Sequence, residues 1–460
     1  MRFERDYFYH SVVQTKQNQK FLRFLFSVLK DYDFNPQTVA EFGPGDCELV
    51  KKMQRVYFLK KVYLIDNNLE FIELGQKGVL NSVGIVKDFR DVKRTDFEEP
   101  LDLVVSSNSF HWIPYNLFEK RNFWVELMHE IYDSLDVGGF LVFHHGLRWS
   151  YFPLYDIANE LFQIRYGRKV DIFKYLFYPS SFELQSILES IGFRFVSQKV
   201  FYETDIVSSE NNGLEYSRED LYRSFAVAGL NAFLWEIENE KEREKFREDF
   251  LILCRIYQPP IFAHRGFFAF RKPFGDDLKI KEKRGDELSS KEIEEVKSIL
   301  EEVADEFVPS LRVRSPDDKN FNNFNNSSSF KGGGDRYLYD LLSKYVFLMA
   351  DYKGEIIGFL TYRVKEAVSI PQSRAMYVST IAVRKRYRKM GAAERFYDYL
   401  FEIGRKFYDK LEIDVIETRT WHANEFAINL LKKKGFQKSL VLKDHREKGI
   451  DTEYYVYKFE

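Results

Sequence analysis

The sequence contains little cysteine and almost no excess of charge. Its two cysteines, Cys47 and Cys254, lie far apart, and no spaced cluster of cysteine or histidine accompanies them. This argues against a disulfide framework or a structural zinc site and suits a reducing cytosol. The 460 residues include 69 basic and 71 acidic side chains, so the formal net charge is -2 and points to no polyanionic partner such as a nucleic acid. No metal site is predicted.

Long apolar runs are absent as well. No stretch of about 18 apolar residues could form a membrane span, and the N-terminus has no apolar core of a signal peptide. We therefore expect a cytoplasmic protein that acts on small or carrier-bound molecules without a membrane partner, and the oligomeric state stays open. At about 100 to 200 residues per domain, the chain is expected to hold two domains.

The most informative stretch is residues 39–46, Val-Ala-Glu-Phe-Gly-Pro-Gly-Asp. A short apolar strand breaks into a loop with Gly43 and Gly45, and a helical run follows, which is how an α/β sheet lets a ligand lie against backbone. A dinucleotide site would need a third glycine where Glu48 stands. A carboxylate there opposes a pyrophosphate but not a cationic centre. The stretch therefore predicts S-adenosylmethionine as the cofactor.

Acidic residues end the strands that follow. Asp66 ends the second strand, where such sheets place an acid on the hydroxyls of a ribose. Asp88 and Phe89 end the third, where a carboxylate can accept from an adenine amino group while the aromatic ring covers the base. Each acid could instead only cap the next helix. Three acids in register, with Glu41 as the first, favour the cofactor.

Strands alternating with helices predict a parallel sheet of α/β class in the first domain. An aromatic-rich segment at 149–178 and two amphipathic helices within 217–257 are expected to lie over the carboxyl edge of the sheet as a lid. The expected strands are 39–43, 62–66, 84–88, 101–106, 140–144, 193–201 and 266–271, and the expected helices are 48–59, 69–77, 122–135 and 181–190.

The order of these residues resembles the class I methyltransferase family from Tyr7 to about Pro273, and within it the trans-aconitate and malonyl-carrier methyltransferases. The matched pieces include Ser106–Ile113 and Leu135–Val142, whereas Cys47 and Ser107 depart from the family pattern. The resemblance implies a Rossmann-like seven-stranded sheet with a helical lid and S-adenosylmethionine as cofactor. The residues that it implies for binding the cofactor are Glu41, Gly43, Gly45, Asp66, Asp88, Phe89 and Ser106.

His111 follows the fourth strand, and by this resemblance it faces the methyl group that is transferred. Methyl transfer needs an oriented nucleophile and a water-poor site, and it needs a base only when the nucleophile carries a proton. A carboxylate acceptor would need none. His111 could therefore act as the catalytic base, orient the acceptor, or only pack.

The charged stretch 274–288 marks the boundary between predicted domains 1–273 and 274–460, and the asparagine-rich segment 315–335 is typical of a flexible insertion. Within the second domain, Arg388, Gly391 and Ala393 open a helix beside several cations, and backbone amides there can hold a pyrophosphate. The expected elements are strands 278–283, 346–351, 356–366, 376–383, 415–420 and 453–459, and helices over 290–307 and from about 393 to 407.

Together with the run from Asn424 to Phe436, this order resembles the GCN5-related N-acetyltransferase (GNAT) family over residues 277–460. The resemblance implies acetyl-CoA, with Arg388, Gly391 and Ala393 at its pyrophosphate, Ile381 and Val383 along its pantetheine arm, and Asn424 nearby. The tyrosine that commonly protonates the leaving thiolate falls at Leu431.

Glu417 and His422 are candidate bases for the amine, with Tyr377 as a similar case, and the alternative is a surface pair at a strand end. We therefore expect a bifunctional transferase, in which an S-adenosylmethionine-dependent methyltransferase is joined to an acetyl-CoA-dependent N-acetyltransferase. The alternative is a methyltransferase whose second domain only binds CoA or acts as a scaffold.

Overall fold

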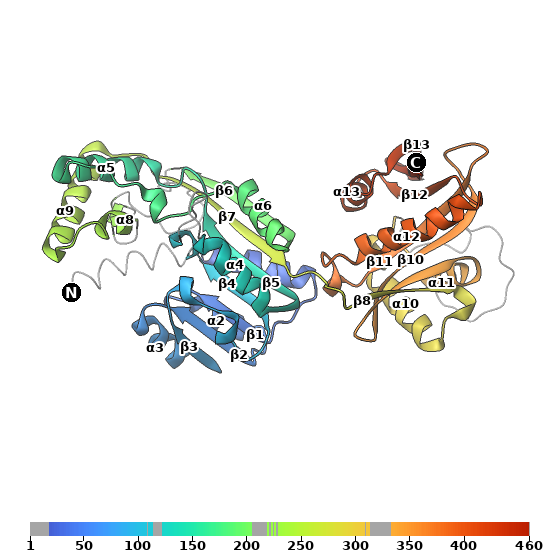
Figure 1. Cartoon of the computed structure of the whole chain (residues 1–460), viewed down its shortest axis with the longest axis horizontal. Helices are drawn as coiled ribbons and strands as arrows, with labels where there is room; N and C mark the ends of the chain where they lie inside the picture. The colour runs from blue at the N-terminus through green and yellow to red at the C-terminus, as the bar shows by residue number, and fades with distance from the viewer. Residues whose placement is uncertain are drawn as a thin grey trace. The chain divides into compact units, whose positions relative to one another are not determined.

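The computed structural model describes residues 18–107, 109–113, 122–204, 219, 222–223, 225–226, 229–308, 310–312 and 333–459. The chain divides into two compact units, Met1–Pro273 and Phe274–Glu460, and each unit is built on a seven-stranded sheet (Figure 1).

The sheet of the first unit has the strand order β3-β2-β1-β4-β5-β7-β6. Strands β1 to β5 are parallel to one another, whereas β7 is antiparallel to both β5 and β6. The order reverses between β1 and β4, so a ligand is expected outside the carboxyl ends of these strands. The predicted seven-stranded methyltransferase-type sheet is confirmed. Its strands are β1 Thr38–Phe42, β2 Lys61–Asp66, β3 Ser82–Val86, β4 Leu101–Ser107, β5 Leu135–Gly146, β6 Arg194–Thr204 and β7 Phe262–Arg271.

Helices cover both faces of this sheet and begin at the capping residues that the sequence provides. Asn68 caps α3, Asn122 caps α4, and Ser180 forms a capping box with Glu183 at α6. One core joins residues 18–31 and α2 to one face, and a second joins α4 and α6 to the other. These helices are α2 Glu48–Gln54, α3 Leu69–Gly78, α4 Phe123–Ser134 and α6 Ser181–Ile191.

The inserted segments form a third core of their own, beyond one end of the sheet (Figure 1). Aromatic side chains fill it, including Tyr155 and Phe162 of α5 and Phe246 of α9. This is the helical lid expected from the sequence. Its elements are α5 Phe152–Tyr166, the 3-10 turn η4 Ile172–Lys174, α8 Asn231–Leu234 and α9 Glu240–Tyr257.

The sheet of the second unit has the order β13-β14-β12-β11-β10-β9-β8, and only β11 and β12 are parallel within it. Helix α12 lies along one face and α10 along the other (Figure 1). The strands are β8 Leu278–Arg284, β9 Val346–Tyr352, β10 Glu355–Glu366, β11 Arg374–Val383, β12 Val415–Trp421, β13 Gln437–Glu447 and β14 Ile450–Lys458, and the helices are α10 Ser290–Glu302, α11 Gly333–Lys344, α12 Ala392–Asp409 and α13 Glu425–Lys433.

Three features of the second unit differ from the prediction. The expected helix over 290–307 ends at Glu302 and continues as the short 3-10 turn η6 at Ala304–Glu306. Most of the predicted flexible insertion lies outside the described residues, but its last three residues belong to the first turn of α11. Strand β13 was not predicted.

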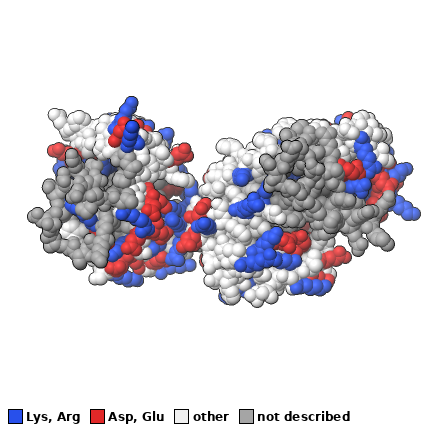
Figure 2. All heavy atoms as spheres, turned by 180° about the vertical axis from the view of Figure 1, so that it is seen from behind, with Lys and Arg blue, Asp and Glu red and all other residues white. Residues whose placement is uncertain are grey.

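Basic and acidic side chains are interspersed on the face seen in Figure 2, and neither sign forms a continuous patch there. This agrees with the formal net charge of -2. Among the described residues, no helix combines the length and the apolar character that crossing a membrane requires.

Candidate functional site

The glycine turn after β1 has the close approach that the sequence predicts. Gly43 has φ +67°, and a Cβ built on it would lie 2.1 Å from Ser109 Oγ and 2.6 Å from Ser109 Cβ. Gly45 has φ +51°, but a Cβ there would have no heavy atom within 4 Å. Backbone conformation favours glycine at both positions, and space additionally demands it at Gly43.

Glu41 is the buried acid of this turn. Its side chain is 2% exposed, and Oε2 has no hydrogen-bond partner in the described part of the chain. Burial, with the charge of Asp46, raises the pKa of Glu41 to about 8, against a hydrogen bond from the Val50 amide and the charge of Lys51. A buried carboxyl with an unused oxygen fits a cationic or hydrogen-bond-donating group of a ligand.

The two other predicted strand-final acids, Asp66 and Asp88, differ from each other. Asp66 ends β2, but β3 ends at Val86 and Asp88 caps the 3-10 turn at Phe89–Asp91, so the predicted end of the third strand is wrong by two residues. Burial raises the pKa of Asp66, and one of its oxygens accepts from the Asn68 amide at 2.9 Å. Asp88 accepts from Arg90 with both oxygens, at 2.9 Å from Nε and 2.8 Å from Nη2, and also caps the turn that follows. The side chain of Arg90 thus already occupies Asp88, whereas Asp66 keeps an oxygen for a ligand.

Phe89 and Ser106 complete the predicted cofactor set. The ring of Phe89 packs edge-on against Phe42, with ring centroids 5.5 Å apart, and lies 3.6 Å from a Cβ built on Gly43. Ser106, the residue before the last of β4, has no exposed surface, and no described residue hydrogen-bonds its Oγ. Both residues therefore lie around the glycine turn, and their roles toward the cofactor stay predictions.

His111 is buried among aromatic rings. It is 5% exposed and stacks on Tyr178 with ring centroids 5.7 Å apart and planes 16° from parallel. Its carbonyl accepts from the Phe177 amide at 2.9 Å. These contacts fix the ring firmly, so the geometry favours packing and orientation over the role of a mobile base.

Three residues that the prediction missed lie at the same edge of the sheet. His144 and His145 end β5, and Arg265 of β7 lies opposite Gly146. Both nitrogens of His144 and Nη1 of Arg265 lack partners among the residues that the structure describes, although both side chains are at most 3% exposed. The two consecutive histidines near the end of a predicted strand could have been recognised in the sequence as candidate site residues. Arg265 could not, because it comes near them only through the pairing of β7 with β5.

Burial controls the protonation of these three side chains. Burial, with the charge of Arg265, lowers the pKa of His144 well below 6.5, and burial lowers that of His145 to about 4. Burial also lowers the pKa of Arg265 to about 10, which leaves it charged at neutral pH. The guanidinium lies over the ring of Tyr151 at 5.3 Å. The edge therefore offers one cation beside two neutral imidazoles.

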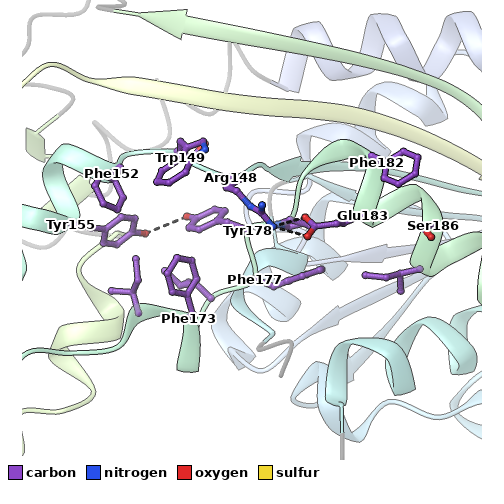
Figure 3. Close-up of a pocket in the computed structure, with 15 residues that line it drawn as sticks. Arg148, Trp149, Phe152, Tyr155, Phe173, Phe177, Tyr178, Phe182, Glu183 and Ser186 are labelled. Atoms are coloured by element: carbon purple, nitrogen blue, oxygen red, sulfur yellow. Dashed lines mark hydrogen bonds and ion pairs between the residues drawn. The ribbon is translucent and has the colours of Figure 1, made fainter. Parts of the chain in front are cut away.

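A pocket of about 620 Å³ lies between the inserted helices and α6 (Figure 3). A volume of this size suits a small organic molecule. Tyr178 lines it and stacks on His111, so the pocket adjoins the residues around His111. Its polar side chains are partly joined to one another: Arg148 Nη2 contacts both oxygens of Glu183 at 2.6 and 2.7 Å, and the Tyr155 and Tyr178 hydroxyls are 3.2 Å apart. The remaining wall is largely aromatic, including Trp149, Phe152, Phe173 and Phe182.

In the second unit, the predicted pyrophosphate loop has the expected backbone conformation, but its arginine side chains already form ion pairs within the chain. Gly391 has φ +96° at the N-cap of α12, directly before Ala392 and Ala393. Arg388 makes a bidentate pair with Glu306, at 2.9 and 2.8 Å, and also donates to the Val383 carbonyl. The neighbouring arginines pair with acids too, Arg384 with Glu302 and Arg386 with Glu355. The chain itself neutralises these charges.

Strands β11 and β12 separate at the position predicted for the pantetheine arm. Their pairing ends at Val378 and Thr418, while β12 goes on to pair with β14 as far as Trp421. The Arg384 amide donates to the Ile357 carbonyl of β10. The direction of backbone N–H and C=O groups alternates along a strand. Those of Ile381 and Val383 therefore point away from β10, toward the side on which β12 no longer pairs with β11.

Glu417, a candidate base, is buried beneath a loop and is not at the surface of a strand end. Its side chain has no exposed surface, and its carboxylate accepts from the Val368 amide and from the amide and hydroxyl of Ser369, at 2.7 to 3.1 Å. These donors belong to the loop between β10 and β11. Glu417 therefore anchors that loop instead of facing a substrate.

His422 is likewise engaged. Its Nδ1 accepts from the Asp451 amide at 3.2 Å. A neutral histidine that accepts at Nδ1 carries its proton on Nε2, so the lone pair that a base needs is already used. Asn424 caps α13 by accepting from the Ala427 amide at 3.3 Å. The structure thus gives His422 and Asn424 local roles at the end of β12.

Leu431, at the position of the expected tyrosine, is 2% exposed in α13. A different phenol lies beside the point where β11 and β12 separate: Tyr377 is 5% exposed, and burial raises its pKa. A phenol with a raised pKa stays protonated at neutral pH. Tyr377 is therefore unsuited to be a base but can donate a proton.

Comparison with known proteins finds a similarity within the second unit. The model of the acetyltransferase (GNAT) family matches residues 303–436. A curated relative, an N-alpha-acetyltransferase of Sulfurisphaera tokodaii, is 29% identical over 111 residues. The match spans 23% of this chain and 65% of the relative's length.

Among solved structures, a candidate methyltransferase from Bacillus halodurans is 15% identical, with 52% of this chain and 94% of that chain covered and a TM-score of 0.34. A candidate GNAT acetyltransferase from Desulfovibrio desulfuricans is 13% identical, with 39% and 98% covered and a TM-score of 0.29. With TM-scores this low, the fold of the first unit rests on its own strand order. The chain joins a seven-stranded methyltransferase-type sheet to a second unit in which residues 303–436 are similar to the acetyltransferase (GNAT) family.

Proposed function

We propose that the first unit transfers a methyl group from S-adenosylmethionine and that the second transfers an acetyl group from acetyl-CoA to an amine. The observation that carries the first half is the set of buried polar atoms without a described partner where β1, β4, β5 and β7 meet. Such groups cost about 1–3 kcal/mol each when left unsatisfied. A bound ligand would supply their partners.

The residues around the glycine turn fit this cofactor. Glu41 would hold a cationic part of it and Asp66 the ribose hydroxyls, while Gly43 leaves room for backbone contact. When bound, the cofactor supplies an electrophilic methyl group. The task of the chain is to orient the acceptor and to exclude water.

The acceptor that fits best is a carboxylate with an apolar part. Neither His144 nor His145 is suited to be a base, because burial lowers both pKa values, and a carboxylate needs no base. Arg265 offers a buried cation for a negatively charged acceptor. The aromatic pocket beside Tyr178 would take the apolar part.

For the second unit, the family match and the separation of β11 from β12 support acetyl transfer. The curated relative is named for acetylating α-amines, so an amine is the acceptor class that we propose. Ile381 and Val383 would pair with the pantetheine arm, and Tyr377, whose raised pKa keeps it protonated, would give a proton to the leaving thiolate.

A specific observation favours the alternative of a binding module without catalysis. Arg388 is paired with Glu306, Glu417 is buried and accepts from the Val368 and Ser369 amides, and Nδ1 of His422 accepts from the Asp451 amide. Under this alternative, the second unit would bind CoA weakly and transfer nothing.

The test is a pair of titrations and one screen on the full chain. Calorimetry with each cofactor measures binding, and a metabolite mixture incubated with both cofactors is searched by mass spectrometry for gains of a methyl or an acetyl group. Absence of S-adenosylmethionine binding would overturn the first half of the proposal. Binding of acetyl-CoA without any acetylated product would favour the alternative for the second unit.

A further inference from the structure

Three cations gather on one face of the second sheet, around Tyr377. Arg363 of β10 is the register partner of Tyr377, and Lys365 Nζ lies 3.7 Å from the centre of its ring. On the other side, Tyr377 pairs with Glu417 of β12, and Arg419 lies two residues further along, on the same face. We call Arg363, Lys365 and Arg419 the cation cluster.

The cluster has no acidic partner. Among the described residues, none of the three cations forms an ion pair with a carboxylate; instead, the Arg363 guanidinium lies 4.8 Å from the ring centre of Tyr345, and Arg419 Nη1 is 3.5 Å from the Tyr454 hydroxyl. This contrasts with the paired arginines of the pyrophosphate loop.

One acid, Glu417, lies close enough to act on the cluster. Its carboxylate accepts hydrogen bonds from Val368 and Ser369 and forms no ion pair with the three cations. Burial lowers the pKa of Lys365, the charge of Glu417 raises it, and the charges of Arg363 and Arg419 lower it. Both arginines therefore repel Lys365.

Buried polar atoms without partners lie on the same face of the sheet as the cation cluster. Thr361 lies two residues before Arg363 on the same face of β10, with no exposed surface, and its Oγ1 has no hydrogen-bond partner within the described ranges. Arg363 Nε is also buried without such a partner. Buried donors without acceptors are rare in folded chains, and an anion would satisfy both.

The position of the cluster relates it to acetyl transfer. Pairing between β11 and β12 ends at Val378 and Thr418, directly beside Tyr377 and Arg419. This is where the proposed pantetheine arm would present its thioester. A group bound by the cluster would therefore lie next to the acetyl group.

We propose that the cation cluster binds an anionic group, a carboxylate or a phosphate, of the amine that the second unit acetylates. This rests on the proposed acetyl transfer and names its substrate class. In that reaction the amine nitrogen bonds to the acetyl carbon, the carbon–sulfur bond breaks, and the proton lost by the amine balances the one gained by the thiolate. Nearby cations also favour the neutral, nucleophilic amine over the ammonium. An amine without an anionic group would gain nothing from the cluster.

The test compares charged and neutral partners of matched shape on the full chain. Ligand-observed NMR titrations measure the dissociation constants of alanine against alaninamide and of O-phosphoethanolamine against ethanolamine. We expect the anionic member of at least one pair to bind about 10- to 100-fold more tightly, as for hydrogen bonds to charged groups. The pair with the larger ratio identifies the carboxylate or the phosphate.

Substitutions test whether the cation cluster causes the difference in affinity between anionic and neutral amines. Arg419→Gln should reduce the ratio to about threefold or less, Arg419→Lys should restore part of it, and Lys410→Gln at the C-cap of α12 should leave it unchanged. Equal binding of charged and neutral partners, or a ratio that Arg419→Gln does not change, would overturn the proposal. Because binding is measured without turnover, failure of acetyl transfer appears separately, as absence of acetyl-CoA binding or of product.

Discussion

The two units differ in how they partner their charged and polar groups. In the first, Glu41, Ser106, His144 and Arg265 are buried at one edge of the sheet with atoms that no described residue satisfies. In the second, the three arginines of the loop before α12 pair with acids of the chain, as Arg388 with Glu306 illustrates, whereas Lys389 of the same loop lies over the ring of Phe426. The first unit thus has its unsatisfied polar atoms where the cofactor is predicted, whereas the arginines of the predicted loop in the second unit are already paired.

This difference shows that a motif and a site are separate properties. A motif fixes backbone shape: both glycine turns have the positive φ angles that their sequences require. A site also needs polar atoms that are left without partners, since these make ligand binding favourable. The predictions that follow test each unit on this criterion.

The largest expected effect is at the glycine turn of the first unit. In Gly43→Ala, the new Cβ would overlap Ser109 and the residue would have a strained φ of +67°. Overpacking costs about 1–3 kcal/mol, and the left-handed conformation adds about 1–2 kcal/mol. We expect S-adenosylmethionine affinity to fall roughly 100-fold by calorimetry.

Gly45→Ala is the matched control, because its φ is similar and no heavy atom lies within 4 Å of the new Cβ. It should lose tenfold or less. Equal losses in the two variants would mean that backbone strain, and not the overlap with Ser109, weakens binding. Circular dichroism should report both variants as folded.

The next effect separates the two strand-final acids. Asp66→Ala removes a carboxylate that keeps an oxygen for the ribose, and a charge-assisted hydrogen bond is worth about 1.5–3 kcal/mol, so affinity should fall about 10- to 100-fold. Asp88→Ala should lose less, because Arg90 already occupies its oxygens. A larger loss at Asp88 would show that its ion pair opens when the cofactor binds.

The raised pKa of Glu41 predicts that both the stability of the fold and the affinity for S-adenosylmethionine depend on pH. Its folded-state pKa of about 8 exceeds the ordinary 4.5, so the ligand-free unit keeps a proton that the unfolded chain releases. The contribution of this group to stability therefore decreases as pH rises from 4.5 to about 8. A cationic ligand favours the carboxylate, so binding releases this proton.

Calorimetry in buffers of different ionisation enthalpy measures that release. Affinity for S-adenosylmethionine should rise by up to about tenfold per pH unit until the pH nears the folded-state pKa, and then level off. In Glu41→Gln both the proton release and this rise should disappear. A pH-independent affinity in the natural chain would mean that Glu41 does not contact a cationic part of the cofactor.

Local sequence signals predicted much of the first site and less of the second. Glycines and strand-final acids such as Gly43 and Asp66 are set by neighbours a few residues away, and the sequence shows them directly. Arg265 lies near His144 only because β7 pairs with β5, although more than a hundred residues separate the two side chains in the sequence. Nothing local indicates such a pairing.

In the second unit, too, the features that the sequence did not show depend on contacts between residues far apart in the chain. Glu417 has the chemistry of a base, but a loop 48 residues away in sequence supplies its donors. Strand β13 was missed because residues 437–447, Gln-Lys-Ser-Leu-Val-Leu-Lys-Asp-His-Arg-Glu, form a polar edge strand without clear alternation. Tertiary contacts decide such cases.

The smallest expected effect concerns the neutralised loop of the second unit. If Glu306 holds Arg388 away from the pyrophosphate of acetyl-CoA, then Glu306→Gln should free the guanidinium and remove a competing negative charge. Both side chains are partly exposed, at 32% for Arg388 and 45% for Glu306. An exposed ion pair is worth about 0.2–1 kcal/mol, so calorimetry should show an affinity gain of about two- to fivefold. The gain should shrink at high salt, because solvent-exposed charges are screened.

Glu301→Gln, an exposed position in the last turn of α10, controls for the lost surface charge alone. If Glu306→Gln instead weakens binding, the ion pair positions Arg388 for the pyrophosphate, and the pairing of its cations does not distinguish this loop from a functional site.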